Sequence, residues 1–231
     1  MALEWRFFLD PRLWAALTSG AWMTIKLTLF SSAGALLVGI AITVVRLFGG
    51  RLLRNLAELY TNVVRDVPLL IQLFFFYFGI SMTVPATEFP FLRSEYFGQV
   101  VTILTISLAM GGFVAELIRA GIEAVPVGQV ETALAGGLTR YQVYRYVVAP
   151  QLLPIVLPGL SSEIVNVLKG TTFAMTIGVA DLMWQAQSVE SETFRGLETM
   201  TAITVAYFVL GIAIIFAFRR LENFFHIPAP K

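Results

Sequence analysis

The chain has 231 residues, of which 57% are hydrophobic, and its mean hydropathy is +0.78. This composition excludes an ordinary soluble domain and is typical of a protein that crosses a membrane several times. The net charge of +1 gives no reason to expect a nucleic-acid partner, and the absence of cysteine excludes disulfides and thiolate metal sites.

The first segment, residues 1–18, mixes aromatic and charged side chains and is expected to lie in the membrane interface. Its mixed charge and its lack of a small-residue cleavage site argue against a signal peptide. The first apolar run, residues 21–45, is long enough to cross a bilayer. Ala35, Gly39 and Thr43 place small residues on one face of it, which predicts close packing against another helix.

A basic connector and an interfacial stretch lead to a second apolar segment that begins near Pro68. Proline is tolerated at the start of a helix, where its missing N–H costs least. Gln72 lies inside this segment, where a side-chain amide needs a partner. A hydrogen bond to a neighbouring helix and a contact with a transported molecule both remain open.

The third span is predicted over residues 100–122, after an outer loop with a short interfacial or re-entrant piece at 83–99. Glu116 and Arg119 lie three residues apart in this span. They therefore share a helix face, and we favour a structural pair near the cytoplasmic end over a contact with substrate.

The fourth span, residues 153–177, carries an unusually polar face. Such a face is costly in lipid and should line a cavity or contact another helix. Glu163 and Lys169 are equally compatible with an ion pair and with a path for a transported molecule. A loop at 181–198, in which acidic residues outnumber the single Arg195, precedes a last span at 200–218.

Lysine and arginine gather in the first connector, in residues 123–150 and at the C-terminus, whereas the loops at 83–99 and 181–198 hold one each. By the positive-inside rule, the N-terminus lies outside and the C-terminus in the cytoplasm, and five spans satisfy that alternation.

A polar, glycine-punctuated island at 125–150 separates the third and fourth spans and must face water or a partner. Proline at its start and the pair Gly136 and Gly137 divide it into two predicted helices, 127–135 and 138–148, the second closed by Pro150.

This island resembles the EAA loop of membrane subunits of ATP-binding-cassette (ABC) importers, which reads Glu-Ala-Ala, three residues, Gly, nine residues, Ile-x-Leu-Pro. The positions that correspond to this pattern are Glu131, Thr132, Ala133, Gly137, Val147, Ala149 and Pro150. Thr132 and Ala149 depart from the pattern. In that family the loop docks into a groove on the cytoplasmic ATPase subunit.

Other stretches resemble the polar amino-acid branch of the same family. Arg65, Pro68 and Gln72 match its Arg-Gly-Thr-Pro-Leu-Leu-Val-Gln. Residues 115–121 with Gly128 and Gln129 are close to its Ala-Glu-x-x-Arg-Gly-Gly and Gly-Gln, with Ala120 in place of the first Gly of the pair. The family has Leu-Lys-Asp in the fourth span, whereas Gly170 follows Lys169 here. The missing acid argues against carboxylate recognition of a cationic substrate.

The resemblance implies an all-α integral membrane protein with a five-span type I ABC-importer permease fold, forming one domain over residues 1–231 with a cytoplasmic helical coupling loop at 123–150. It implies ATPase-coupling roles for Gly128, Gln129, Glu131, Ala133, Gly137, Arg140 and Pro150. Candidate substrate-path residues are Gln72, Glu163, Lys169, Thr171 and Thr172.

The chain shows no nucleotide-binding motif, no catalytic triad and no metal cluster, so it is not expected to be an enzyme. The resemblance implies a multi-pass permease of the bacterial inner membrane, with a second permease subunit, two ATP-binding subunits that carry ATP and Mg²⁺, and a periplasmic substrate-binding protein. Among substrates we favour glutamate, aspartate or glutamine. The alternatives are a permease for a basic amino acid and an ion-coupled secondary carrier.

Overall fold

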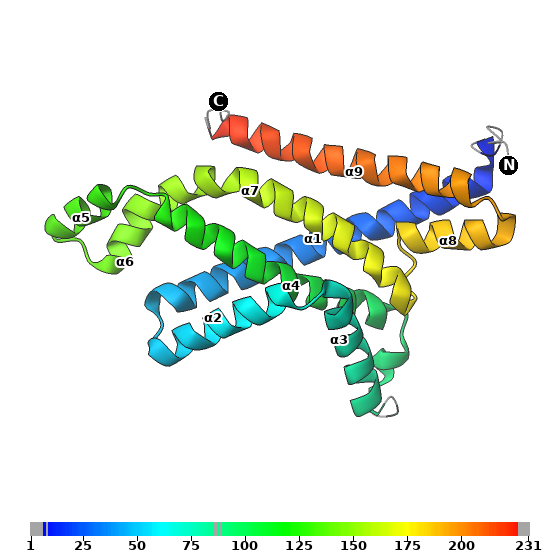
Figure 1. Ribbon diagram of the computed structural model, residues 1–231, viewed down its shortest axis with the longest axis horizontal. Coiled ribbons are helices and arrows are strands. Elements are labelled where there is room, and N and C mark those ends of the chain that lie inside the picture. Colours follow the sequence, from blue (N-terminus) through cyan, green and yellow to red (C-terminus); the bar gives the residue numbers. More distant parts are fainter. Residues whose placement is uncertain (1–6, 8, 86, 88, 226–231) are drawn as a thin grey trace.

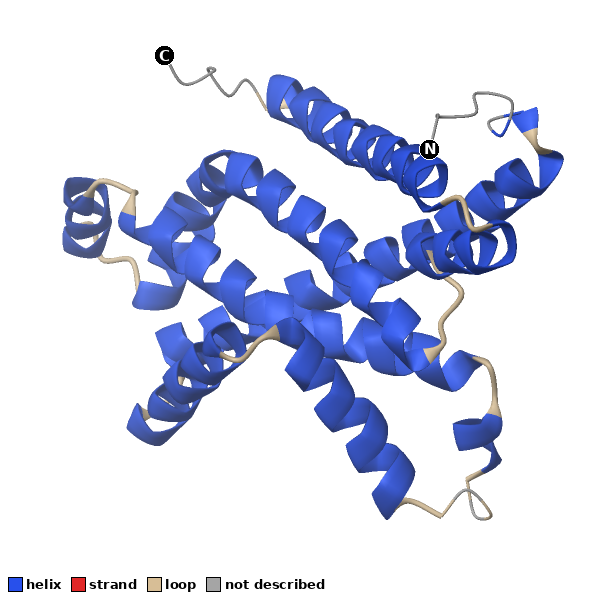
Figure 2. Cartoon of the chain, turned by 45° about the vertical axis from the view of Figure 1, so that its right-hand side comes forward, coloured by secondary structure: helices blue, strands red, loops and turns tan. Residues whose placement is uncertain are grey.

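The computed structural model describes residues 7, 9–85, 87 and 89–225. The described residues fold into helices joined by short connections, and they contain no β-strand (Figure 1 and Figure 2). The all-α fold predicted from the sequence is confirmed.

The elements, in chain order, are α1 (Pro11–Phe48), α2 (Arg51–Asp66), α3 (Leu69–Thr83), η2 (Pro90–Arg93), α4 (Tyr96–Glu123), α5 (Val127–Ala135), α6 (Arg140–Val143), η3 (Tyr144–Val148), α7 (Ala149–Gly170), η4 (Thr171–Ile177), α8 (Leu182–Thr193) and α9 (Gly196–Phe224). Four segments are long and apolar enough to cross a membrane: α1, α4, residues 140–177 and α9. The pair α2 and α3, bent by 105°, provides the fifth as one broken span.

Helix α1 begins earlier than the sequence suggested. Asp10 caps it by accepting a hydrogen bond from the Arg12 backbone N–H at 2.8 Å, and Pro11 is its first residue. Residues 11–18 thus continue directly into the first span as one helix, and residues 1–6 and 8 lie outside the described part of the chain.

Small residues allow α1 and α4 to pack closely along their length. Ala35, Gly39 and Thr43 are buried, as their shared face predicted. A Cβ added at Gly39 would lie 2.5 Å from a methyl carbon of Val114, so only glycine permits this approach. The two helices form the packed centre of the molecule, which we call the α1–α4 seam (Figure 1).

The bend between α2 and α3 uses Pro68 and Gln72. Val67 has the extended backbone that a residue before proline prefers. The Gln72 side-chain amide donates to the carbonyls of Val64 and Val67, both at 2.8 Å. The partners of Gln72, which the sequence left open, are thus carbonyl groups at the end of α2 that would otherwise lack a hydrogen bond.

The segment predicted as a loop at 181–198 contains α8, which packs against α1. Asp181 caps α8 by accepting from the Trp184 backbone N–H at 2.8 Å, and the Tyr207 hydroxyl of α9 donates to its other oxygen at 3.4 Å. The Leu182 backbone N–H donates to Thr24 Oγ1 at 3.0 Å. The buried N-cap explains the helix that hydropathy did not indicate.

Candidate functional site

The island between the third and fourth spans, residues 123–150, is called the EAA-like loop below. Its first helix, α5, has the predicted bounds. The turn after it depends on Gly137, whose φ of +85° lies in the left-handed region. Thr139 then caps α6 through reciprocal hydrogen bonds with Gln142, so the second helix begins at Arg140 rather than at residue 138.

Pro150 does not close the second helix, contrary to the prediction. The chain continues from α6 through the π-helical turn η3 into α7, and residues 140–177 form one long helical segment. Pro150 is the second residue of α7, and the wider π-turn before it changes the hydrogen-bond register where the proline lacks its N–H. The helical segment that contains the fourth span therefore begins well before residue 153, inside the EAA-like loop.

The EAA-like loop has a small core of its own and a polar contact with α7. Val125, Val143 and Val148 form a small buried cluster against which Ala133 packs. Gln151 Nε2 of α7 donates to Gln129 Oε1 of α5 at 2.8 Å. These contacts fix α5 against the start of the fourth span.

The remaining residues that the sequence singled out in this loop are exposed. They are Gly128, Glu131, Gly137, Arg140 and Pro150. A Cβ added at Gly128 or Gly137 would meet no atom within 4 Å. Figure 1 shows α5 and α6 projecting from one end of the molecule, so these residues form a surface available to a partner.

The sequence did not predict two anchors of the loop. Gln151 is one; its only signal was a polar side chain between apolar residues. The other is Phe48, at the end of α1, whose ring lies 5.6 Å from that of Tyr144 and 6.2 Å from that of Tyr141. Aromatic residues near a span end are common in membrane proteins, so no pattern pointed to this contact.

The polar residues of the fourth span do not gather at one point. Glu163 and Lys169 form no ion pair, because six residues, about one and two-thirds turns, place them on different sides of the helix. Glu163 accepts a weak hydrogen bond from Asn166 at 3.5 Å. Lys169 and Thr172 line a groove of about 380 Å³ that α7 shares with α9. Thr171 is fully buried.

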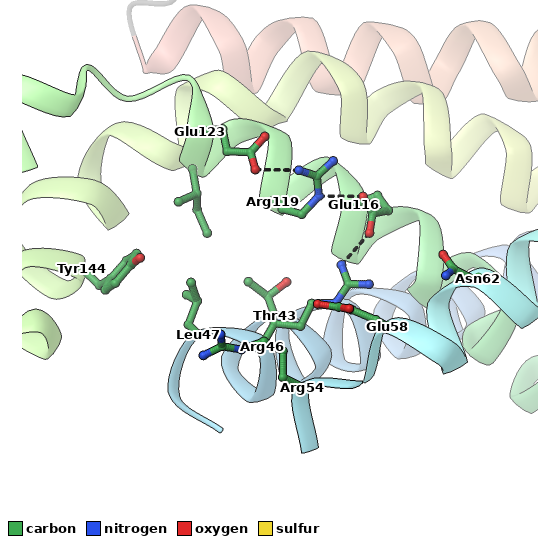
Figure 3. A pocket seen from close by; sticks show the side chains of 11 residues that line it. Thr43, Arg46, Leu47, Arg54, Glu58, Asn62, Glu116, Arg119, Glu123 and Tyr144 are labelled. Atoms are coloured by element: carbon green, nitrogen blue, oxygen red, sulfur yellow. Dashed lines mark hydrogen bonds and ion pairs between the residues drawn. The ribbon is translucent and has the colours of Figure 1, made fainter. Parts of the chain in front are cut away.

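Glu116 and Arg119 pair as predicted, with Arg119 Nε 2.8 Å from Glu116 Oε2. The structure adds two members. Arg46 of α1 pairs with the other oxygen of Glu116, and Arg119 also contacts Glu123 at 2.6 Å (Figure 3). These four alternating charges join the end of α1 to the end of α4, beside the start of the EAA-like loop.

The fold and this loop define a helical subunit of a membrane transporter. Residues 35–226 match the family described as binding-protein-dependent transport system inner membrane component. The glutamine transport system permease protein GlnP of Escherichia coli K12 is 33% identical over 90% of this chain and 91% of its own. The glutamate/aspartate import permease protein GltJ of the same strain is 33% identical over 91% and 87%.

A crystal structure of an amino acid ABC transporter with histidines superimposes with a TM-score of 0.84 at 29% identity, covering 96% of this chain and 99% of the other. An inward-facing structure of the MetNI methionine ABC transporter gives 0.78 at 18% identity, covering 94% and 99%, and shows the shared fold. The chain thus belongs to the family of binding-protein-dependent transport system inner membrane components and is a permease subunit of an amino-acid ABC importer.

Membership of this family resolves several expectations from the sequence. The chain is a multi-pass protein of the inner membrane, it is not itself an enzyme, and ATP hydrolysis belongs to a separate subunit. An ATPase and a substrate-binding protein are its partners. The family favours this role over an ion-coupled carrier.

Proposed function

We propose that this permease subunit imports glutamate, aspartate or glutamine. The observation that carries the proposal is Lys169, which is exposed at the groove between α7 and α9, forms no ion pair with Glu163, and is followed by Gly170 instead of an acid. An unneutralised ammonium group inside a membrane span favours a substrate with a carboxylate or an amide over a cation. The two E. coli relatives at 33% identity are named for the same substrates.

The test is uptake competition in the reconstituted importer with its own binding protein. Unlabelled glutamate, aspartate or glutamine should inhibit uptake, and arginine, lysine and histidine should not. Lys169→Ala should abolish uptake while assembly is retained, and Thr176→Ala, a nearby exposed position that does not line the groove, should not. Inhibition by arginine or histidine alone would instead support the rival substrate class, which the solved transporter with histidines favours.

We also propose that the EAA-like loop is the docking element for the ATPase. Its support is the exposed, projecting α5, together with the match of Glu131 and Gly137 to the family pattern. The complete importer then contains two permease subunits, identical or paralogous, two ATP-binding subunits that hold ATP and Mg²⁺, and one periplasmic binding protein. Copurification with quantitative mass spectrometry tests this composition: a stoichiometric ATPase supports it, and an active permease without one contradicts it.

The proposed orientation has the N-terminus outside and the EAA-like loop and the C-terminus in the cytoplasm. It rests on the distribution of lysine and arginine among the connections. Because the chain has no cysteine, single cysteines report topology without background. In intact cells an impermeant thiol reagent should label cysteine at Ser191 or Ser94 and should not label it at Thr139. Labelling at Thr139 would reverse the assignment.

A further inference from the structure

A polar cavity of about 570 Å³ lies between α1, α2 and α4, at the end of the molecule that carries the EAA-like loop (Figure 3). None of the proposed substrate-path residues lines it. Its volume is within the range of small-molecule sites and exceeds that of an amino acid. The cavity is therefore distinct from the groove at Lys169.

One wall of the cavity is already neutralised. Arg46, Glu116, Arg119 and Glu123 alternate in sign along it, and each contacts the next. Arg46 is the most enclosed, with 12% of its side chain exposed. The four charges of this wall sum to zero, so the wall has no net charge with which to attract a ligand. Arg119 and Glu123 are nevertheless exposed and could contact one.

The opposite wall carries unpaired groups. Arg54, Glu58 and Asn62 follow one another at four-residue spacing on α2, and all three line the cavity. No ion pair or hydrogen bond of their side chains occurs within the described part of the chain. Arg54 precedes Glu58, which is the less favourable order for an i,i+4 pair on a helix. One cation, one anion and one amide thus remain available side by side.

The setting of α2 explains why these groups face inward. Its other face is apolar and exposed, with Leu52, Leu56, Leu59 and Val63 each at least half exposed. In a membrane such a helix places its apolar face in lipid. The cavity is then the space in which Arg54 and Glu58 find water or a ligand.

The charge balance selects the class of ligand. A simple anion would approach Glu58, Glu116 and Glu123, and a simple cation would approach the three arginines, so neither is favoured. A small zwitterion matches both free charges at once. We propose that this cavity binds a zwitterion whose oxyanion pairs with Arg54 and whose ammonium group pairs with Glu58, while Asn62 provides a further polar contact.

Two sources provide this chemistry: a free α-amino acid and the phosphoethanolamine headgroup of a phospholipid. Either would bridge α2 to the ends of α1 and α4. Glu123, the first residue of the EAA-like loop, and Tyr144, in its π-helical turn η3, also line the cavity. A bound zwitterion therefore lies where it can influence the position of that loop.

The experiment uses the permease purified with its ATPase subunits in nanodiscs of phosphatidylglycerol alone. In one arm, titration calorimetry measures binding of glutamine and glutamate. In the other, phosphatidylethanolamine is added, and native mass spectrometry counts the molecules retained. We expect one source to bind, and Arg54→Gln and Glu58→Gln each to weaken binding tenfold or more, since each removes a charge-assisted hydrogen bond. Arg51→Gln, on the same helix but outside the cavity lining, should bind as the wild type does.

Three results would overturn the proposal: neither source binds, Arg54→Gln and Glu58→Gln bind as tightly as the wild type, or the amino acid is lost only in Lys169→Ala. Binding that persists in Lys169→Ala and is lost in Arg54→Gln assigns the ligand to this cavity. The substrate proposal is tested separately by uptake with the binding protein, so failure of one leaves the other measurable.

Discussion

Glycines occur both in the α1–α4 seam and in the EAA-like loop, and they serve different purposes in the two regions. At Gly39 and Gly111 the neighbouring helix leaves no room for a Cβ atom. At Gly128 and Gly137 the space is open, and Gly137 is required for its left-handed backbone. In the seam, glycine brings two helices together. In the loop, glycine ends α5 and allows the chain to turn into α6. The seam thus favours rigidity, and the loop favours access to a partner.

A substitution that fills the seam should cause a large loss of stability. Gly111→Ala would place a Cβ 2.5 Å from Val38 Cγ1 and 2.7 Å from its Cβ, and a valine cannot move its short side chain away. We expect a loss of about 1–3 kcal/mol in stability, the usual cost of overpacking. Gly128→Ala, in the open loop, should be neutral or slightly stabilising because alanine favours helix. Thermal denaturation of the two variants makes the comparison, and equal melting temperatures would contradict it.

The second prediction concerns the corner where α8 packs on α1. Burial raises the pKa of Asp181 to about 7, above the value of about 3.9 for an unfolded chain. The folded state then holds its proton more tightly, so stability is greatest below about pH 4 and decreases as the pH rises to about 7, by an amount on the order of a few kcal/mol.

Asp181→Asn should remove this dependence, because asparagine also caps a helix and carries no charge. The measurement is the melting temperature between pH 5 and 8 in detergent. The wild type should lose stability across that window and the variant should change much less. Parallel profiles would show that Asp181 is ionised without cost in the folded protein.

In the loop, substitutions should impair coupling and leave the fold intact. Gly137→Val forces a branched side chain into a left-handed backbone, at a cost of about 1–2 kcal/mol. Glu131→Lys reverses an exposed charge on the proposed docking surface. Both should reduce transport-stimulated ATPase activity about tenfold while membrane insertion is retained; the melting temperature should stay near wild type in Glu131→Lys and fall by only a few degrees in Gly137→Val.

Gly136 provides the matched control for Gly137. Its φ is −73°, and an added Cβ would meet only ordinary contacts at 3.4 Å. Gly136→Ala should therefore keep nearly full stimulation. If Gly137→Val and Glu131→Lys also keep it, the loop does not dock the ATPase in the way proposed.

The smallest effect is expected at the hydrogen bond between Gln129 and Gln151. A neutral hydrogen bond contributes about 1 kcal/mol, so Gln151→Ala should lower coupled ATPase activity severalfold with little change in melting temperature. A double-mutant cycle isolates the contact: Gln151 Nε2 also donates to the Val147 carbonyl at 2.7 Å, so once Gln129→Ala is present, Gln151→Ala should add only the part of the loss that is due to this second bond. Fully additive losses would mean that the two residues act separately.

The sequence alone determined the features that depend on local periodicity. Apolar runs long enough for a bilayer located the spans, and glycine and proline located α5 within the EAA-like loop. The face of small residues at Ala35, Gly39 and Thr43 predicted the seam. The three-residue spacing of Glu116 and Arg119 predicted their pair, because neighbours on one helix are set by helix geometry.

Only the tertiary structure decided which distant groups meet. The partners of Gln72 depend on the bend at Pro68, and the burial of Asp181 depends on α1 and α9 closing over the start of α8. The pairing of Arg46 with Glu116 joins residues 70 positions apart. Hydropathy and spacing carry no information about such contacts, because they arise from how whole helices pack against one another.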